Sequence, residues 1–179
     1  MIDTDRLILR PWRDTDRAPY AEMSLSPEVM EHLGGLSTPE QVNAGIARMR
    51  ASQAEHGFCF WAVERRADGA FLGFCGLKRA ADAGTPIEGD IEIGWRLRRD
   101  AWGQGYGMEA ARASLGWGWA TLDVARIIAM TVPANHRSRG LMERIGMIRR
   151  PDLDFGHPAF PEGHPLHRHI VYAVARPGS

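Results

Sequence analysis

The sequence predicts an α/β protein with one mixed β-sheet covered by helices, and three observations support this. A strand, a glycine-rich turn and an amphipathic helix follow one another in the middle of the chain. A nearly continuous apolar strand comes directly after that helix, as expected when both faces of a strand are covered. With 179 residues, the chain has the size of one domain. We therefore expect a single domain over residues 1–179 with one hydrophobic core.

The central strand is predicted by alternation between residues 90 and 97. Apolar positions alternate there with polar or glycine positions, setting Ile91, Ile93, Trp95 and Leu97 against Asp90, Glu92, Gly94 and Arg96. This period of two is typical of a strand with one buried face. The strand is therefore expected to end near Arg98, with Glu92 on its polar face.

The turn after this strand holds Gly103, Gly105 and Gly107. A helix is predicted next, because apolar residues recur at steps of three and four, at Met108, Ala111, Leu115, Trp119 and Leu122. Glycine lets the backbone approach a ligand closely, and a helix N-terminus adds unpaired N–H donors and a partial positive charge. The pattern favours a phosphate or pyrophosphate site, with a tight turn that binds nothing as the alternative.

Two common phosphate-binding motifs are excluded by their spacing. A Walker loop needs Gly-Lys followed by Ser or Thr, and the sequence contains no such run. The dinucleotide fingerprint needs Gly-x-Gly-x-x-Gly early in a βαβ unit, whereas this chain has Gly-x-Gly-x-Gly after a strand in its middle. The glycine turn therefore belongs to another kind of site.

Residues 98–110, RRDAWGQGYGMEA, resemble the acyl-CoA loop of the GNAT-type N-acetyltransferase superfamily, whose pattern is Gln/Arg-x-x-Gly-x-Gly/Ala at a helix start. Gly105 and Gly107 match, while Trp102 stands where the family has Gln or Arg. The EIGW before this loop and the DRLILRPW near the N-terminus are similar to the RimJ/RimL-like branch, the ribosomal-protein alanine acetyltransferases. The resemblance extends from Asp5 to about Arg176. It implies a mostly antiparallel sheet, helices on both faces and one parallel pair that splays apart.

The same resemblance implies acetyl-CoA as co-substrate and names its contacts. These are Leu97, Arg99, Gln104, Gly105, Tyr106, Gly107, Met108 and Asn135. Residues 132–147, VPANHRSRGLMERIGM, resemble the family's second motif, in which Asn135 hydrogen-bonds CoA and Ser138 protonates the departing thiolate. Glu92 is then the candidate base, acting through water. The residues alone leave plainer roles open: Asn135 as a helix cap, Ser138 as an ordinary first-turn residue, and Glu92 paired with Arg96.

The expected acceptor is a primary amine, with a protein or peptide N-terminus placed first. An α-amino group with a pKa near 8 costs only about 1 kcal/mol to deprotonate at neutral pH, whereas lysine costs nearly 5. A small-molecule amine, such as an antibiotic or polyamine, is the alternative, and an acidic cleft around Glu88, Asp90 and Glu92 would favour it. A non-catalytic acyl-CoA-binding module is a further alternative. By resemblance, residues 32–37 border the acceptor site.

The flanking elements follow from local signals. Strands are predicted over residues 6–12, 58–65, 70–78 and 166–175, and the middle two are joined by an Asp-Gly hairpin turn. Helices are predicted over residues 14–25, from Thr38 with a capping box, and after Asn135. Gly116 and Gly118, inside the central helix, indicate close packing against the sheet.

Composition excludes several partners. The 22 Lys and Arg residues balance the 22 Asp and Glu residues, so no overall charge favours nucleic acid or a membrane.

Cys59 and Cys75 lie in apolar runs, which predicts buried reduced thiols, a cytoplasmic location and direct acetyl transfer without an acyl-cysteine. No apolar run is long enough to span a membrane. A monomer or homodimer is expected. Histidines between residues 157 and 169 lack zinc-finger spacing, so no metal is expected.

Overall fold

The computed structural model describes residues 1–178, so Ser179, the last residue of the predicted domain, lies outside the described residues. Within them, nine strands form one sheet in the order β1-β2-β3-β4-β5-β6-β9-β7, and β8 pairs with β9 off this path. The strands are β1 Ile2–Asp3, β2 Leu7–Arg10, β3 Phe60–Arg65, β4 Phe71–Arg79, β5 Ile91–Leu97, β6 Arg126–Thr131, β7 Ile148–Arg149, β8 Phe155–Gly156 and β9 Arg168–Ala175.

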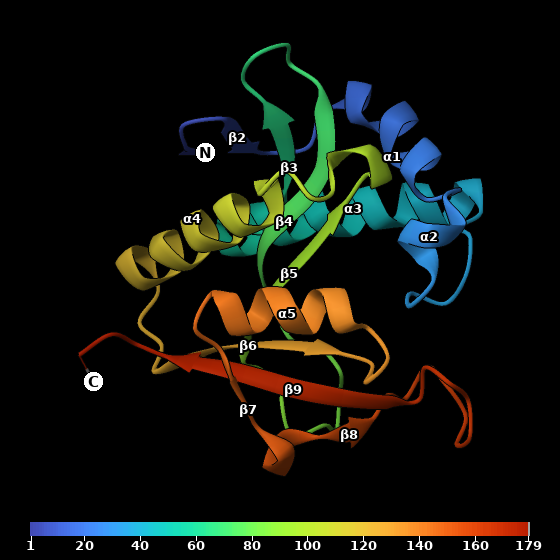
Figure 1. Cartoon of the computed structure of the whole chain (residues 1–179), viewed down its shortest axis with the longest axis vertical. Helices are drawn as coiled ribbons and strands as arrows, with labels where there is room; N and C mark the ends of the chain where they lie inside the picture. The colour runs from blue at the N-terminus through green and yellow to red at the C-terminus, as the bar shows by residue number, and fades with distance from the viewer. Residues whose placement is uncertain (179) are drawn as a thin grey trace.

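The α-helices are α1 Arg17–Met23, α2 Pro27–Met30, α3 Pro39–His56, α4 Tyr106–Thr121 and α5 His136–Arg144. Short 3-10 turns occupy η1 Asp14–Asp16, η2 Arg99–Ala101 and η3 Pro151–Leu153. In Figure 1, α4 passes in front of the sheet and α3 passes behind it. The expected α/β architecture with helices on both faces is therefore confirmed. The long N-terminal helix predicted over residues 14–25 is divided into η1 and α1.

The sheet is mixed, as predicted. Within residues 1–178 every strand pair is antiparallel except β5 and β6, which run parallel and share one register position, Glu92 opposite Ile128. No register pair joins the last residues of β5 to β6. The carboxyl ends of the two strands therefore part on the side where the glycine turn begins.

Alternate residues of β4 show how the two faces are covered. Cys75 lies 3.7 Å from Ser114 of α4, and Leu77 faces Gly118 of the same helix. Phe74, the residue before Cys75, points to the other face and packs against Trp12 and Tyr20. The buried side chains of both faces form the hydrophobic core.

Local signals correctly predicted the starts of α3 and α5. Thr38 and Gln41 form the reciprocal capping box of α3. Asn135 caps α5 by accepting a hydrogen bond from the backbone N–H of Ser138. Two details of α4 differ from expectation. The helix already begins at Tyr106, so Gly107 lies inside it, and Gly116 is exposed with no neighbour within 4 Å of an added Cβ. Only Gly118 is required by packing on the sheet.

Candidate functional site

The glycine turn between β5 and α4 forms a loop whose backbone donors are unused. Gly103 and Gly105 have φ values of 75° and 83°, in the left-handed region that side chains disfavour, and Gly105 is the N-cap of α4. Within residues 1–178, no backbone N–H from Gly103 to Met108 donates a hydrogen bond to the protein. A run of unpaired N–H groups at a helix N-terminus is suited to an anion.

Arg6, just before β2, supports this loop from behind. Its Nη1 donates to the carbonyl oxygen of Gln104 at 3.0 Å, and its guanidinium lies 4.7 Å from the centre of the Tyr106 ring. Its Nη2 pairs with Glu109 of α4 at 2.7 Å. Burial alone would raise the pKa of the Glu109 carboxyl. Hydrogen bonds from Thr4 and Arg6 outweigh this effect and lower the pKa. Arg6 therefore supports the loop, and Glu109 neutralises the positive charge of Arg6.

Trp102, the residue that departs from the family pattern, has a structural role. Its indole Nε1 donates to the carbonyl oxygen of Leu97, at the end of β5, at 2.9 Å. Two guanidiniums lie against its ring, that of Arg99 at 5.0 Å and that of Arg137 at 4.5 Å from the centroid. Both arginines are exposed, and neither forms an ion pair in the described part of the chain. Trp102 thus places two cations beside the loop.

The start of α5 adds the second group of predicted residues. Oδ1 of Asn135 accepts the backbone N–H of Ser138 at 3.1 Å, so the capping role of Asn135 is confirmed. The Ser138 hydroxyl makes no hydrogen bond within residues 1–178. Arg137 lies between them in the sequence and touches Trp102. A Cβ added at Gly107 would lie 3.4 Å from Leu141 of α5. The glycine loop and the start of α5 therefore flank one region.

Glu92 differs from its predicted environment. The polar face of β5 is covered, and Glu92 is only 6% exposed. Its partner is Lys78 of β4, with Nζ 3.0 Å from Oε2, while Arg96 lies over the ring of Phe74. The alternative role left open for Glu92, pairing with Arg96, is therefore wrong. The ammonium of Lys78 therefore supplies the positive charge that compensates this buried carboxylate.

The pKa of Glu92 follows from this environment. Burial raises the pKa of this carboxyl above its ordinary value, and the charge of Asp82 acts in the same direction. Lys78 opposes both effects. A carboxyl with a raised pKa can accept a proton more readily near neutral pH than an exposed one.

Comparison with known proteins identifies the family of this chain. A family model described as an acetyltransferase (GNAT) domain matches residues 6–148. The chain belongs to the GNAT acetyltransferases. The uncharacterized protein YkkB of Bacillus subtilis is 32% identical over 145 residues, which cover 80% of this chain and 83% of YkkB.

Solved structures show the same fold. A GNAT-family acetyltransferase from Bacillus anthracis is similar with a TM-score of 0.78 and 25% identity, covering 98% of each chain. RimL, a ribosomal L7/L12 α-N-protein acetyltransferase in complex with coenzyme A, has a TM-score of 0.74 and 16% identity, covering 96% of this chain and 95% of its own. The expected likeness to RimL is thus present in the fold.

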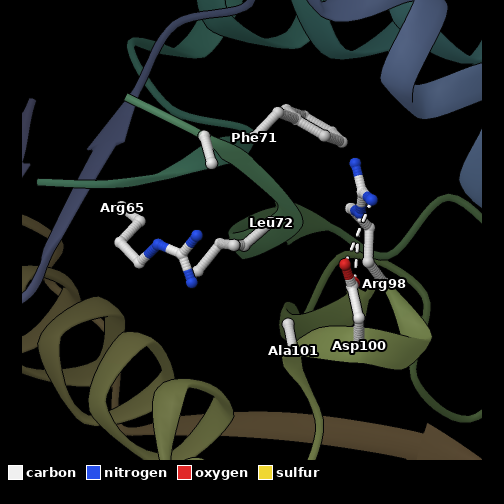
Figure 2. Close-up of a pocket in the computed structure, with 7 residues that line it drawn as sticks. Arg65, Phe71, Leu72, Arg98, Asp100 and Ala101 are labelled. Carbon is white, nitrogen blue, oxygen red and sulfur yellow. Dashed lines mark hydrogen bonds and ion pairs between the residues drawn. The ribbon is translucent and has the colours of Figure 1, made fainter. Parts of the chain in front are cut away.

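A small cavity of the acetyltransferase lies beside the glycine loop rather than in it. It measures about 140 Å³ and is lined by Arg65, Ala70, Phe71, Leu72, Arg98, Asp100 and Ala101. Figure 2 shows the paired Arg98 and Asp100 on one side and the guanidinium of Arg65 on the other. A wider hollow of about 390 Å³ lies where β5 and β6 begin, around Asp90 and Arg126. Neither is lined by a predicted site residue.

The remaining expectations concern metals, thiols and membranes. Within residues 1–178, no group of three or more His, Cys, Asp and Glu side chains is arranged to hold a metal ion. Cys59 and Cys75 are buried and free, and burial raises the pKa of each thiol to about 12. None of the helices in the described range combines the length and apolar composition needed to cross a membrane.

Proposed function

We propose that this acetyltransferase binds the diphosphate of acetyl-CoA on the backbone N–H groups from Gly103 to Met108 and transfers the acetyl group directly to a primary amine. The observation that supports this most strongly is the run of N–H groups with no acceptor in the described chain. Such donors cost stability unless a ligand or water satisfies them. Leu97 and Asn135, at the two edges of the region, would complete the contacts.

Arg99 and Arg137 support the same assignment by charge. Each guanidinium lies on Trp102 without a carboxylate partner in residues 1–178. Arginine suits phosphate because its planar fork can donate two hydrogen bonds at once. Arg137 was not singled out from the sequence, although its place between Asn135 and Ser138 was a usable signal. We propose that both arginines add to phosphate binding.

The chemistry follows from the two polar side chains nearest the parting strands. The amine loses a proton, for which Glu92 is the proposed acceptor through water, and its nitrogen then attacks the thioester carbon. The C–N bond forms as the C–S bond breaks, and the Ser138 hydroxyl donates a hydrogen bond to the departing sulfur. The buried thiols support direct transfer, because a pKa of about 12 leaves almost no thiolate at neutral pH. They also support a reducing, cytoplasmic compartment.

We propose a protein or peptide N-terminus as the acceptor. The acids that would attract a polyamine are each engaged: Asp90 pairs with Arg126 at 2.7 Å, Glu92 with Lys78, and Glu88 accepts the backbone N–H of Gly84. The acidic cleft that would favour a small cationic amine is therefore not supported. RimL, which shares the fold, is described as an α-N-protein acetyltransferase. An α-amino group also needs less help from a base than lysine does.

Two glycines of α4 provide a matched test of the loop assignment. Gly107→Val adds bulk at the start of α4, where its Cβ would lie 3.4 Å from Leu141 and 3.6 Å from Leu97, whereas Gly116→Val adds it on the exposed side of the same helix. Calorimetry should show at least a tenfold loss of acetyl-CoA affinity for Gly107→Val and no loss for Gly116→Val. Undiminished binding by Gly107→Val would rule out the loop.

The acceptor and the acid need separate experiments. Thiol release should be followed with N-terminal peptides and with small amines, and faster release with polyamines would overturn the peptide assignment.

Ser138→Ala should lower turnover at saturating substrates with little change in acetyl-CoA affinity, since the hydroxyl acts on the leaving sulfur. Unchanged turnover would remove that role from Ser138.

A further inference from the structure

Arg96 of β5 carries a charge that the described part of the chain does not compensate. Its guanidinium carbon lies 5.3 Å from the centre of the Phe74 ring, and no carboxylate of residues 1–178 comes within ion-pairing distance. The side chain is only partly exposed. Its Nε is shielded from water and donates no hydrogen bond within the same residues. Such a cation attracts an anion strongly, because little water competes for it.

A second buried arginine shows how the same fold compensates a charge of this kind. Arg10 of β2 is 3% exposed, and its guanidinium pairs with Asp16 at 2.8 Å and with Glu64 at 2.7 Å. Hydrogen bonds to these carboxylates raise the pKa of Arg10 above its ordinary value. Burial instead lowers the pKa of Arg96, and the hydroxyl of Tyr20 opposes this effect. Arg10 is thus a structural arginine, whereas Arg96 is left available for a ligand.

The neighbours of Arg96 hold its guanidinium in place. Phe74 lies directly opposite Arg96 in the ladder between β4 and β5, so the cation rests on the face of that ring. Phe74 is packed between Phe60, stacked at 5.7 Å, and Tyr20, whose ring centre is 6.2 Å away. Tyr20 is fixed in turn by α3, because a Cβ added at Gly45 would lie 3.0 Å from its hydroxyl oxygen. A guanidinium held in this way loses little freedom when it binds a carboxylate.

Arg96 lies on the same face of β5 as Glu92. The two-residue period of the strand places both there, with Gly94 between them, and their partners in β4 are Phe74 and Lys78. The helix α4, which begins at the glycine loop, packs on the other face of the sheet. Because Glu92 is the proposed proton acceptor, the amine has to lie on the face that carries Arg96.

Arg96 is also close enough to the reacting region to touch the acceptor. It lies on the part of β5 that has no register partner in β6, one residue before Leu97. It is separated from Glu92 by about 13 Å between Cα atoms, as expected for residues four apart on a strand. The two side chains take up part of this distance, and one or two extended substrate residues, at about 3.5 Å each, span the rest. A carboxylate near the start of a peptide can therefore reach Arg96 while the amino group lies beside Glu92.

We propose that Arg96 binds a carboxylate of the acceptor, and that the acceptor is a peptide or protein N-terminus with Asp or Glu as its first or second residue. This inference rests on the proposed function and narrows its acceptor. The guanidinium fork can donate two parallel hydrogen bonds to one carboxylate, which fixes both the position and the direction of the entering peptide. A polyamine would instead be repelled by Arg96.

A matched pair of variants, Arg96→Met and Arg98→Met, tests this role. Methionine keeps an unbranched apolar stem against Phe74 and removes the charge and the donors. Arg98 already pairs with Asp100 at 3.1 Å, so its loss serves as the charge control. Urea unfolding should show no loss of stability for Arg96→Met, because the fold leaves this charge uncompensated. A destabilised Arg96→Met would show that the fold itself uses the charge and would overturn the proposal.

The readout is the ratio of kcat/KM for pairs of peptides that differ only by Asp against Asn at the first or second residue. Asn has the shape of Asp without its charge. The wild type should favour the Asp peptide about tenfold or more at one of the two positions. Arg96→Met should bring this ratio close to one, mainly through KM, whereas Arg98→Met should keep it. Equal kcat/KM values for the wild type at both positions, or a preference that survives in Arg96→Met, would overturn the proposal.

Free amino acids and their amides test the α-carboxylate as the source of the bound group. Faster transfer to the free acids than to acidic peptides, lost in Arg96→Met, would keep Arg96 as a carboxylate site but overturn the peptide acceptor.

Calorimetry of the Asp and Asn peptides with the CoA-bound protein needs no turnover. The Asp peptide should bind about tenfold more tightly, and Arg96→Met should abolish the difference. Equal binding of the two peptides to the wild type would overturn the carboxylate site even if acetyl transfer is confirmed. A wild type that binds the Asp peptide through Arg96 but acetylates no amine would instead refute the proposed function.

Discussion

The indole N–H of Trp102 donates a hydrogen bond of 2.9 Å to the carbonyl oxygen of Leu97, which joins the glycine loop to the last residue of β5. The residue that departs from the family pattern therefore does not leave the loop unsupported. Its ring also carries Arg99 and Arg137, so one side chain links the loop, the strand and the start of α5. A polar residue at this position would lack both the ring and its two cation contacts.

Trp102 can be tested by replacing it with the residue type that the family uses. Trp102→Gln should weaken acetyl-CoA binding about fivefold, because Arg99 and Arg137 lose the ring that positions them. It should also lower the free energy of unfolding by about 2 kcal/mol, as expected for truncating a partly buried aromatic side chain. Calorimetry and chemical denaturation measure the two effects. Tighter acetyl-CoA binding by Trp102→Gln would show that Trp102 weakens the site relative to the family residue and does not support the loop.

The Arg10–Asp16 pair is expected to dominate the stability of the N-terminal region. Both side chains are at least 95% buried, and two hydrogen bonds of 2.8 Å join them. Asp16→Ala leaves the guanidinium with Glu64 and the carbonyl oxygen of Pro11 and should cost about 3 kcal/mol of unfolding free energy. The control is Asp14→Ala, which removes an exposed carboxylate paired with Arg50 and should leave stability unchanged. Equal effects in urea unfolding would contradict this difference.

Glu92 predicts a pH dependence of stability with a definite sign. Burial raises the pKa of this carboxyl in the folded state, so the folded protein binds this proton more tightly than the unfolded chain. Its contribution is then greatest below the ordinary value of 4.5 and is lost as pH rises through the folded pKa. Glu92→Gln should therefore gain stability relative to the wild type between pH 4 and pH 8. A constant difference across urea titrations at these pH values would refute the raised pKa.

Two glycines of α4 should respond to alanine in opposite ways. A Cβ at Gly118 would lie 2.7 Å from Cδ1 of Leu77 and 3.0 Å from Cδ1 of Ile127, whereas one at Gly116 would meet nothing within 4 Å. Gly116→Ala should add about 0.5–1 kcal/mol of stability through helix propensity. Gly118→Ala should instead destabilise the protein by about 1–3 kcal/mol through overpacking. Thermal unfolding of the two variants measures both effects. Stabilisation of both would show that the Leu77 side chain moves to make room for the added methyl group.

The sequence predicted features that depend on near neighbours. The strand alternation before Leu97, the glycine turn and the caps at Thr38 and Asn135 are all local signals, and the structure confirms them. The parallel pairing of β5 and β6 also followed, because a helix between two strands favours it. The family resemblance supplied the assignment of the loop to acetyl-CoA.

Features that depend on distant segments were missed or misjudged. Glu92 was expected on a polar face with Arg96, but Lys78 of the neighbouring strand and the loop that carries Asp82 enclose it instead. Nothing in the spacing of the hairpin histidines indicated that His157 would face Asp82. Likewise, Arg137 joins Trp102 only because the fold brings α5 to the glycine loop. Tertiary contacts of this kind leave no periodic mark in the sequence.

The single register pair between Glu92 and Ile128 has a consequence for how the molecule opens. Antiparallel hydrogen bonding joins strands β1–β5 into one group and strands β6, β9 and β7 into a second group. Few backbone hydrogen bonds connect the two groups. Gly118 of α4 packs on Leu77 of the first group and Ile127 of the second, so that helix clamps them together. Native-state hydrogen exchange should accordingly resolve two cooperative units that separate along this seam, and loosening α4 should release both.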